Sequence, residues 1–201
     1  MPDTGAPHFI PFADPTDLVR DWPALSEDVA EAVADGLDAA GGLVAVKSAI
    51  FTGTQVESNI TASANFAVTD LSITHALADA SNKLIISAFL GAAGSSTGNG
   101  NVGIAVHDGT DLIAIGDADG SRTRVTAGGF VSSGTSNVVV TMPSVTFVHT
   151  PNTTDSRTYT VRAINTRNAT KTLSINRTEA DANTENNTRA VSSLVIQEVK
   201  V

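Results

Sequence analysis

From Leu43 onward, apolar and polar residues alternate along the chain, and this period of two restricts the segment to β-strands. Tyr159, Val161 and Ala163, for example, alternate with threonines and an arginine. Short segments rich in Gly, Asn, Asp, Ser and Thr separate the alternating runs, as expected for tight turns. The predicted strands are residues 43–52, 55–61, 66–74, 83–90, 102–107, 111–116, 138–142, 145–150, 157–164, 171–177 and 191–201. About ten short strands with such turns predict an antiparallel β-sandwich of the jelly-roll type.

Residues 1–42 follow a different pattern and form a separate predicted unit. Five prolines in residues 1–24 favour an extended arm. A helix is then predicted from Ser26, a suitable N-cap, to the glycine pair at 41–42. An apolar stripe of four side chains marks one helix face: Val29, Val33, Leu37 and Ala40. A helix of about 15 residues is marginal alone, so this stripe needs a partner, which is either another protein surface or the sandwich of the same chain.

Charge is distributed unevenly between the two predicted units. Residues 1–42 contain nine acids and one base, a net charge of −8, whereas the remainder contains twelve acids and eleven bases. Neither part offers the clustered basic face that nucleic-acid binding requires. The chain has no cysteine, so disulfides and thiolate metal sites are excluded. No run of about 18 apolar residues occurs, and we expect neither membrane insertion nor a secretory signal.

Sequence patterns with catalytic or metal-binding meaning are weak. The segment GSSTG at 94–98 satisfies the G-x-S-x-G pattern, but it leads toward a strand and not a helix, which favours a turn. The four histidines are isolated from one another, and we expect solvent or turn positions for them. Asp117, Asp119 and Gly120 resemble only the beginning of a calcium loop. His107 and Asp108 precede Gly109, which predicts a hairpin closed at Asp111. We therefore expect no catalytic residue, no metal and no cofactor.

Three groups of segments resemble structural proteins of bacteriophages. FADPTDLVRDWPALSEDVAEAVADGLDAAGG resembles the N-terminal modules of phage tail-fibre and minor tail proteins, in which a proline-containing arm precedes a short Ala/Val/Leu helix. ALADASNKLIISAFLGAAG is similar to a phage segment in which a polar turn precedes an apolar strand. The order SRTYTVRAINT, TLSINRT and TRAVSSLVIQEV is similar to the end of receptor-binding or head-fibre domains that form a trimeric jelly roll. Phage fibres usually insert a shaft, and this sequence contains none.

The resemblance implies a short trimeric appendage on the virion surface, made in the bacterial cytoplasm. It assigns docking to other virion proteins, in the tail or the capsid, to Pro11, Phe12, Pro15, Leu18, Val19, Trp22, Pro23 and Leu25. The apolar helix face would then serve oligomerisation. Loops at the distal end could contact a host glycan or protein through Ser95, Ser96, Asn99, Asn101, Asp117, Asp119, Asn183 and Asn186. Trp22 has an alternative role, which is to staple the arm onto the following helix.

Three alternatives to a tail fibre remain at this stage. A capsid decoration or head-fibre protein has the same size and the same features. A carbohydrate-binding module would normally display several exposed aromatic residues, and this chain has a single Trp and a single Tyr. An enzyme on a β fold would need clustered carboxylates or a Ser/His/Asp set, which the sequence does not display.

Overall fold

The computed structural model describes residues 42–96, 102–128, 140–185 and 187–201. The chain divides into two compact units, Met1–Gly42 and Leu43–Val201, and only the second is described below. The predicted arm and helix lie outside the described residues, together with all their docking and oligomerisation residues. Asn99, Asn101 and Asn186 of the predicted contact loops lie outside them too. No helix within the described ranges is long and apolar enough to cross a membrane.

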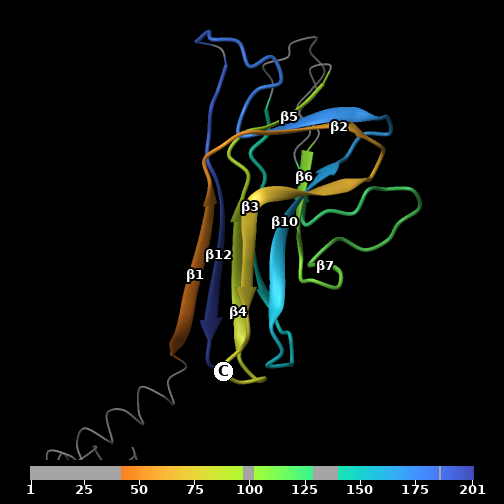
Figure 1. Ribbon diagram of the computed structural model, residues 1–201. Helices are drawn as coiled ribbons and strands as arrows, with labels where there is room; N and C mark the ends of the chain where they lie inside the picture. Colours follow the sequence, from red (N-terminus) through yellow and green to blue (C-terminus); the bar gives the residue numbers. More distant parts are fainter. Residues whose placement is uncertain (1–41, 97–101, 129–139, 186) are drawn as a thin grey trace, which may run out of the picture. The chain divides into compact units, whose positions relative to one another are not determined.

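Twelve strands form three antiparallel sheets in the described part of the chain (Figure 1). The four-stranded sheet has the order β1-β12-β4-β9, the five-stranded sheet has β3-β10-β6-β7 with β8 also on β6, and the three-stranded sheet has β2-β11-β5. The strands are β1 Leu43–Phe51, β2 Gln55–Ile60, β3 Asn65–His75, β4 Lys83–Phe89, β5 Ala93–Ser95, β6 Val102–His107, β7 Leu112–Ile113, β8 Ala127–Gly128, β9 Ser144–His149, β10 Arg157–Asn165, β11 Lys171–Ile175 and β12 Ser192–Val199. The prediction of a mainly β, antiparallel sandwich is confirmed.

The path of the chain between the two larger sheets is that of a jelly roll. The eight main strands in chain order are β1, β3, β4, β6, β7, β9, β10 and β12. Numbered one to eight, they give the order 1-8-3-6 in the four-stranded sheet and 2-7-4-5 in the five-stranded sheet. The chain therefore crosses repeatedly from one sheet to the other, which produces two interlocked Greek keys. The small sheet of β2, β11 and β5 is an addition at one end of this framework (Figure 1).

Four details of the strand prediction were wrong. The predicted strand 111–116 is reduced to β7, and Ala114 follows it with a φ of 52°, a value that strands do not adopt. Described residues 140–142 form no strand, although Thr141 makes an isolated bridge to Ala93. The strands β5 and β8 were not predicted, because glycine-rich segments resemble turns when their strand partners are unknown. The predicted hairpin at Asp108, in contrast, is confirmed. The backbone N of Asp108 donates to the carbonyl of Asp111 at 3.0 Å.

The core lies between the two larger sheets and is built from the alternating residues of the sequence pattern. Its largest fully buried apolar side chains come from both larger sheets, from β11 of the small sheet and from the residue after β4: Leu71, Leu84, Ile86, Leu90, Ile104, Tyr159, Ile164, Leu173, Ile175, Leu194 and Ile196. Each such side chain contributes about 1.5–3 kcal/mol through the apolar surface that it removes from water.

Two buried polar networks close the ends of the sandwich. At one end, Nδ2 of Asn176 donates to the carbonyls of Phe51 and Gly53 at 2.7 and 2.9 Å, and Oδ1 accepts from the hydroxyl of Ser192 at 2.5 Å. At the other end, the carboxylate of Glu198 accepts hydrogen bonds from three residues that precede or follow neighbouring strands. Both residues are buried, so the rigid ends depend on complete hydrogen bonding within the protein.

Candidate functional site

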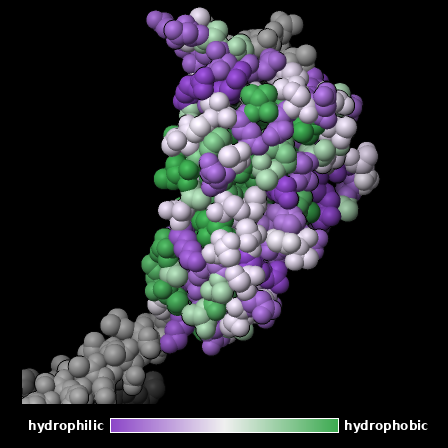
Figure 2. Space-filling model, in the orientation of Figure 1, coloured by the Kyte–Doolittle hydropathy of each residue, from purple (hydrophilic) through white to green (hydrophobic). Residues whose placement is uncertain are grey.

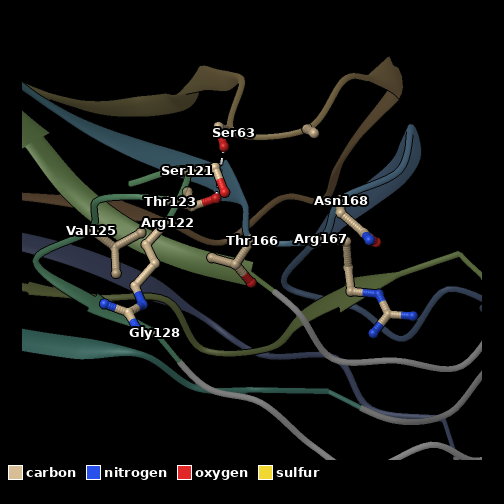
Figure 3. Close-up of a pocket in the computed structure, with 10 residues that line it drawn as sticks. Ser63, Ser121, Arg122, Thr123, Val125, Gly128, Thr166, Arg167 and Asn168 are labelled. Carbon is tan, nitrogen blue, oxygen red and sulfur yellow. Dashed lines mark hydrogen bonds between the residues drawn. The ribbon is translucent and has the colours of Figure 1, made fainter. Parts of the chain in front are cut away.

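A cleft with a volume of about 830 Å³ lies where three loops meet beside β6 and β10 (Figure 3). The loops are the turn between β2 and β3, the segment 121–128 that precedes and includes β8, and the turn between β10 and β11. The lining residues are Ala62, Ser63, Ser121, Arg122, Thr123, Val125, Gly128, Thr166, Arg167 and Asn168. Its volume lies within the range of small-molecule binding sites, which is about 300–1,000 Å³.

Asn165, at the end of β10, holds two of the three loops together. Its Nδ2 donates to the carbonyls of Ile60, Thr61 and Ala169 at 2.8, 3.1 and 2.9 Å, and its Oδ1 accepts from the backbone N of Arg167 at 3.0 Å. The side chain is buried. One amide therefore fixes the turn before β3 against the turn after β10, and it positions Arg167 at the rim of the cleft.

The third loop is held by packing and by one hydroxyl pair. Val125 covers Gly103 of β6 so closely that a Cβ at Gly103 would lie 2.5 Å from Val125 Cγ1. The backbone N of Thr126 donates to the carbonyl of Ile104 at 3.0 Å. The hydroxyls of Ser63 and Thr123 lie 2.7 Å apart and connect this loop with the turn after β2 (Figure 3). The cleft walls are thus joined to one another and to the sheet below.

The charges that line the cleft are both positive. Among the described residues, the lining contains two arginines and no carboxylate, together with four hydroxyl side chains and one amide. Arg122 is 77% exposed and forms an ion pair with Asp119, which lies outside the lining. Arg167 is only partly exposed, and its Nε is buried without a hydrogen-bond partner among the described residues. The cleft therefore offers donors to a polar ligand, and its floor at Ala62 and Val125 offers apolar contact.

The predicted contact residues divide between exposed and buried positions. Asp117, Asp119 and Asn183 are exposed, as expected of loop residues. The expectation for Ser95 was wrong: it is 1% exposed and lies in β5, paired with Leu173 of β11. Ser96 follows β5, and its hydroxyl accepts from the backbone N of Thr172 at 3.0 Å. The turn that the sequence favours at 94–98 is therefore wrong for Gly94 and Ser95, which belong to β5, whereas Ser96 lies in a turn.

The loop after β11 closes on itself. Asp181 forms ion pairs with Arg177 and Arg189 at 3.0 and 2.7 Å, and Asn187 Oδ1 accepts from the hydroxyl of Thr178 at 2.6 Å. A shallow hollow of about 180 Å³ lies within this loop. Within the described residues, no three His, Cys, Asp or Glu side chains gather in a way that could hold a metal ion.

The histidine expectation was wrong for His75, which is buried against Glu198. His75 Nε2 lies 2.8 Å from the Glu198 carboxylate, and Glu198 is 1% exposed. Burial alone would raise the pKa of Glu198, but hydrogen bonds from Asn82, Ala78 and His75 lower it below its ordinary value. Because a carboxylate only accepts hydrogen bonds, Nε2 of His75 carries the proton. The sequence contained a signal for this site, since Glu198 continues the inward series of Leu194 and Ile196.

A second titratable cluster lies nearby, on β9, on β10 and in the turn after β6. The Asp108 carboxylate pairs with Arg157 at 2.5 Å, and the rings of His149 and Tyr159 are 5.8 Å apart in a T-shaped arrangement. Burial raises the pKa of Tyr159 to about 12. Burial also lowers the pKa of His149. For Asp108, burial opposes ionisation, but backbone hydrogen bonds from Asp111 and Thr110 and the charge of Arg157 lower its pKa.

The outer face of the four-stranded sheet carries almost no charge and combines apolar side chains with small polar ones. Strand register places eight apolar side chains on it: Leu43, Val46, Ile50, Ile85, Phe89, Val148, Val195 and Val199. Four of them are exposed, and Ile50 reaches 61%. Figure 2 shows hydrophobic side chains along the edge where β1 lies. Lys83 is the only charged residue at an outward position of these described strands. Sequence periodicity did not reveal this face, because it assigns outward positions to solvent.

Comparison with known proteins identified no family. No family model matches the chain, and no curated protein matches it. One solved structure that matches is that of infectious bursal disease virus, Gx strain, with 14% sequence identity and a TM-score of 0.37. The match covers 79% of this chain and 41% of that chain. Such a distant match carries no argument about function.

Proposed function

We propose that this protein is a structural component of a bacteriophage particle: a short, trimeric, non-catalytic surface appendage whose jelly-roll unit forms the head. The observation that carries the proposal is the nearly uncharged outer face of the four-stranded sheet. Four exposed apolar side chains lie on this face, among small polar ones. Exposed apolar patches on a protein surface mark sites of protein association. The jelly roll itself is shared by viral capsid and lectin domains. Because folds are reused for unrelated functions, the fold only supports the proposal and does not carry it.

Further copies of the same chain are the partner that fits this face best. The whole chain has a net charge of −9, so copies repel one another unless the surface in contact is uncharged. The outer face meets that condition, with Lys83 as its one charged outward residue among the described strands. The edge strand β1 pairs with β12 alone in the described part of the chain, so its other edge is open to a neighbour. We assign docking to another virion protein to residues 1–42, as the resemblance of this segment to phage N-terminal modules implies.

The mass of the full-length protein in solution, measured by light scattering, tests the assembly. We expect a trimer for the natural chain and a monomer for Val46→Asp/Ile50→Asp, because two buried carboxylates without partners oppose association. Val56→Asp is the matched control, since Val56 is an exposed valine on β2, outside the four-stranded sheet. A monomeric natural chain would contradict the trimer. A trimer that survives the double substitution would contradict the choice of face.

Copy number in purified particles tests the virion position. A tail fibre is present in low tens of copies at most, whereas a capsid decoration protein is present in hundreds, as the family resemblance implies. Quantitative mass spectrometry of particles from the phage that encodes this chain gives the number directly. Absence from the particles would overturn the virion proposal, and a count in the hundreds would replace the tail fibre with capsid decoration.

A further inference from the structure

We propose that the cleft between the β2–β3 turn, residues 121–128 and the β10–β11 turn binds an anionic, hydroxyl-bearing small molecule through Arg167 and Arg122. The inference goes beyond the proposed function and does not depend on it, because the cleft is built within one chain. It rests on three observations: the described lining is positively charged, hydrogen bonds within the protein hold the walls of the cleft in place, and Nε of Arg167 has no partner among the described residues.

The sign of the ligand's charge follows from the lining. Two guanidinium groups lie at the cleft, and none of its ten lining residues is an acid. Residues 43–201, which contain the cleft, have twelve acidic and eleven basic residues, yet both charged residues of the described lining are basic. A guanidinium presents several N–H donors in a planar fork, which matches the oxygen atoms of a carboxylate, sulfate or phosphate. A cationic ligand would meet repulsion from both arginines.

Of the two arginines, Arg167 is held more firmly in a position to bind an anion. Its backbone is held by the buried Asn165, so the start of its side chain has a fixed position. Its Nε has no hydrogen-bond partner among the described residues, and its guanidinium carries further N–H donors that suit an oxyanion. Arg122, by contrast, is highly exposed and already pairs with Asp119. We therefore assign the main anion contact to Arg167 and a supporting contact to Arg122.

The rest of the lining indicates what the anionic group is attached to. In Figure 3, Thr166 lies between Arg122 and Arg167, and the paired hydroxyls of Ser63 and Thr123 lie above it in the view. Hydroxyl side chains both donate and accept, so they suit a ligand that carries hydroxyls itself. The methyl groups of Val125 pack over Gly103 and offer an apolar floor to a carbon ring. Sugar acids and sugar phosphates combine all three properties.

Titration calorimetry of the full-length protein at low salt tests the inference with four probes: glucuronic acid, glucose 6-phosphate, inorganic phosphate and glucose. We expect both sugar anions to bind at least about tenfold more tightly than glucose, the difference that one charge-assisted contact contributes. Binding of glucuronic acid above glucose 6-phosphate identifies a carboxylate as the recognised group, and the reverse identifies a phosphate. Equal binding of glucose, tighter binding of phosphate alone than of either sugar anion, or no binding of any probe at millimolar concentration would overturn the inference.

Arg167→Gln should weaken binding of the preferred sugar anion by at least about tenfold, and Arg122→Gln by less. The exposed Arg122 can be replaced without disturbing the fold, so this variant remains informative if Arg167→Gln unfolds. Arg189→Gln is the matched control, because Arg189 is an exposed, ion-paired arginine of a different loop. Binding unchanged in both Arg167→Gln and Arg122→Gln would overturn the assignment. The readout does not involve assembly, so its failure is distinct from failure of the proposed virion function.

Discussion

Replacing Glu198 with alanine should lower the free energy of unfolding by about 3–5 kcal/mol, because three hydrogen-bond donors lose their shared charged acceptor. The structure accounts for this magnitude. The Glu198 carboxylate accepts from the backbone N of Ala78 at 2.8 Å, from Asn82 Nδ2 at 2.6 Å and from His75 Nε2 at 2.8 Å. Alanine leaves three donors without their acceptor, and each buried donor without a partner costs about 1–3 kcal/mol. Because His75 ends β3 and Glu198 ends β12, the pair also joins the two facing sheets.

Glu198→Gln is the matched variant, since it retains the shape and loses the charge. The glutamine oxygen can accept from Ala78 and Asn82, while its amide can donate to a His75 ring whose Nε2 is unprotonated. We therefore expect a loss of only about 1 kcal/mol at neutral pH. This variant should fold even where alanine prevents folding, so it keeps the prediction testable.

The free energy of unfolding should also depend on pH differently in the natural chain and in Glu198→Gln. Hydrogen bonds in the folded state lower the pKa of Glu198, so the folded protein binds this proton less readily than the unfolded chain. The contribution of Glu198 to stability is therefore complete above the ordinary pKa of 4.5 and is lost as the pH falls through the lower, folded value. Glu198→Gln has no such carboxyl, and the natural chain should lose its advantage over this variant as the solution is acidified. The other carboxyls are common to both and cancel.

Urea denaturation at pH 7 and in acidic solution, followed by circular dichroism, measures both effects. A loss below 1 kcal/mol in Glu198→Ala would show that the carboxylate does not hold this end of the sandwich. A constant difference between the natural chain and Glu198→Gln across the pH range would refute the reasoning about the pKa of Glu198.

Three further predictions concern the core and its ends. Tyr159 is the only tyrosine, and burial raises its pKa to about 12, so absorbance at 295 nm should show no phenolate below about pH 11; a transition near pH 10 in the folded protein would contradict its burial. Asn176→Ala should cost about 2–4 kcal/mol in urea denaturation, because it breaks the hydrogen bonds that join the ends of β1, β11 and β12; a cost under 1 kcal/mol would show that water replaces them. Gly91→Ala should lower the melting temperature by several degrees, since its Cβ would lie 2.2 Å from the carbonyl oxygen of Val191, whereas Gly42→Ala, where a Cβ meets nothing, should leave it unchanged.

The sequence predicted strands well where one side of a strand faces the core. In β4 and β12 the buried residues fall at every second position, and the predicted strand bounds lie within one or two residues of the observed ones. It failed where pairing is set by distant chain segments. Nothing local in Ala93–Ser95 indicates a strand, because its partners are Leu173–Ile175 and Thr141, far away in the sequence.

The sequence by itself determined the fold class, the change of pattern at the glycine pair and the uneven charge, because each depends on residue type and spacing alone. Tertiary structure decided which polar residues are buried and which surfaces form. The cleft brings together Ser63, Thr123 and Arg167. Ser63 and Thr123 are 60 residues apart along the chain, and Arg167 follows Thr123 by more than 40. Likewise, Glu198 stands at an inward position of its strand, but only the placement of His75, Ala78 and Asn82 makes a buried carboxylate stable there. Side-chain pattern encodes the period of a strand, whereas the partners of that strand are set by long-range pairing, which no local pattern contains.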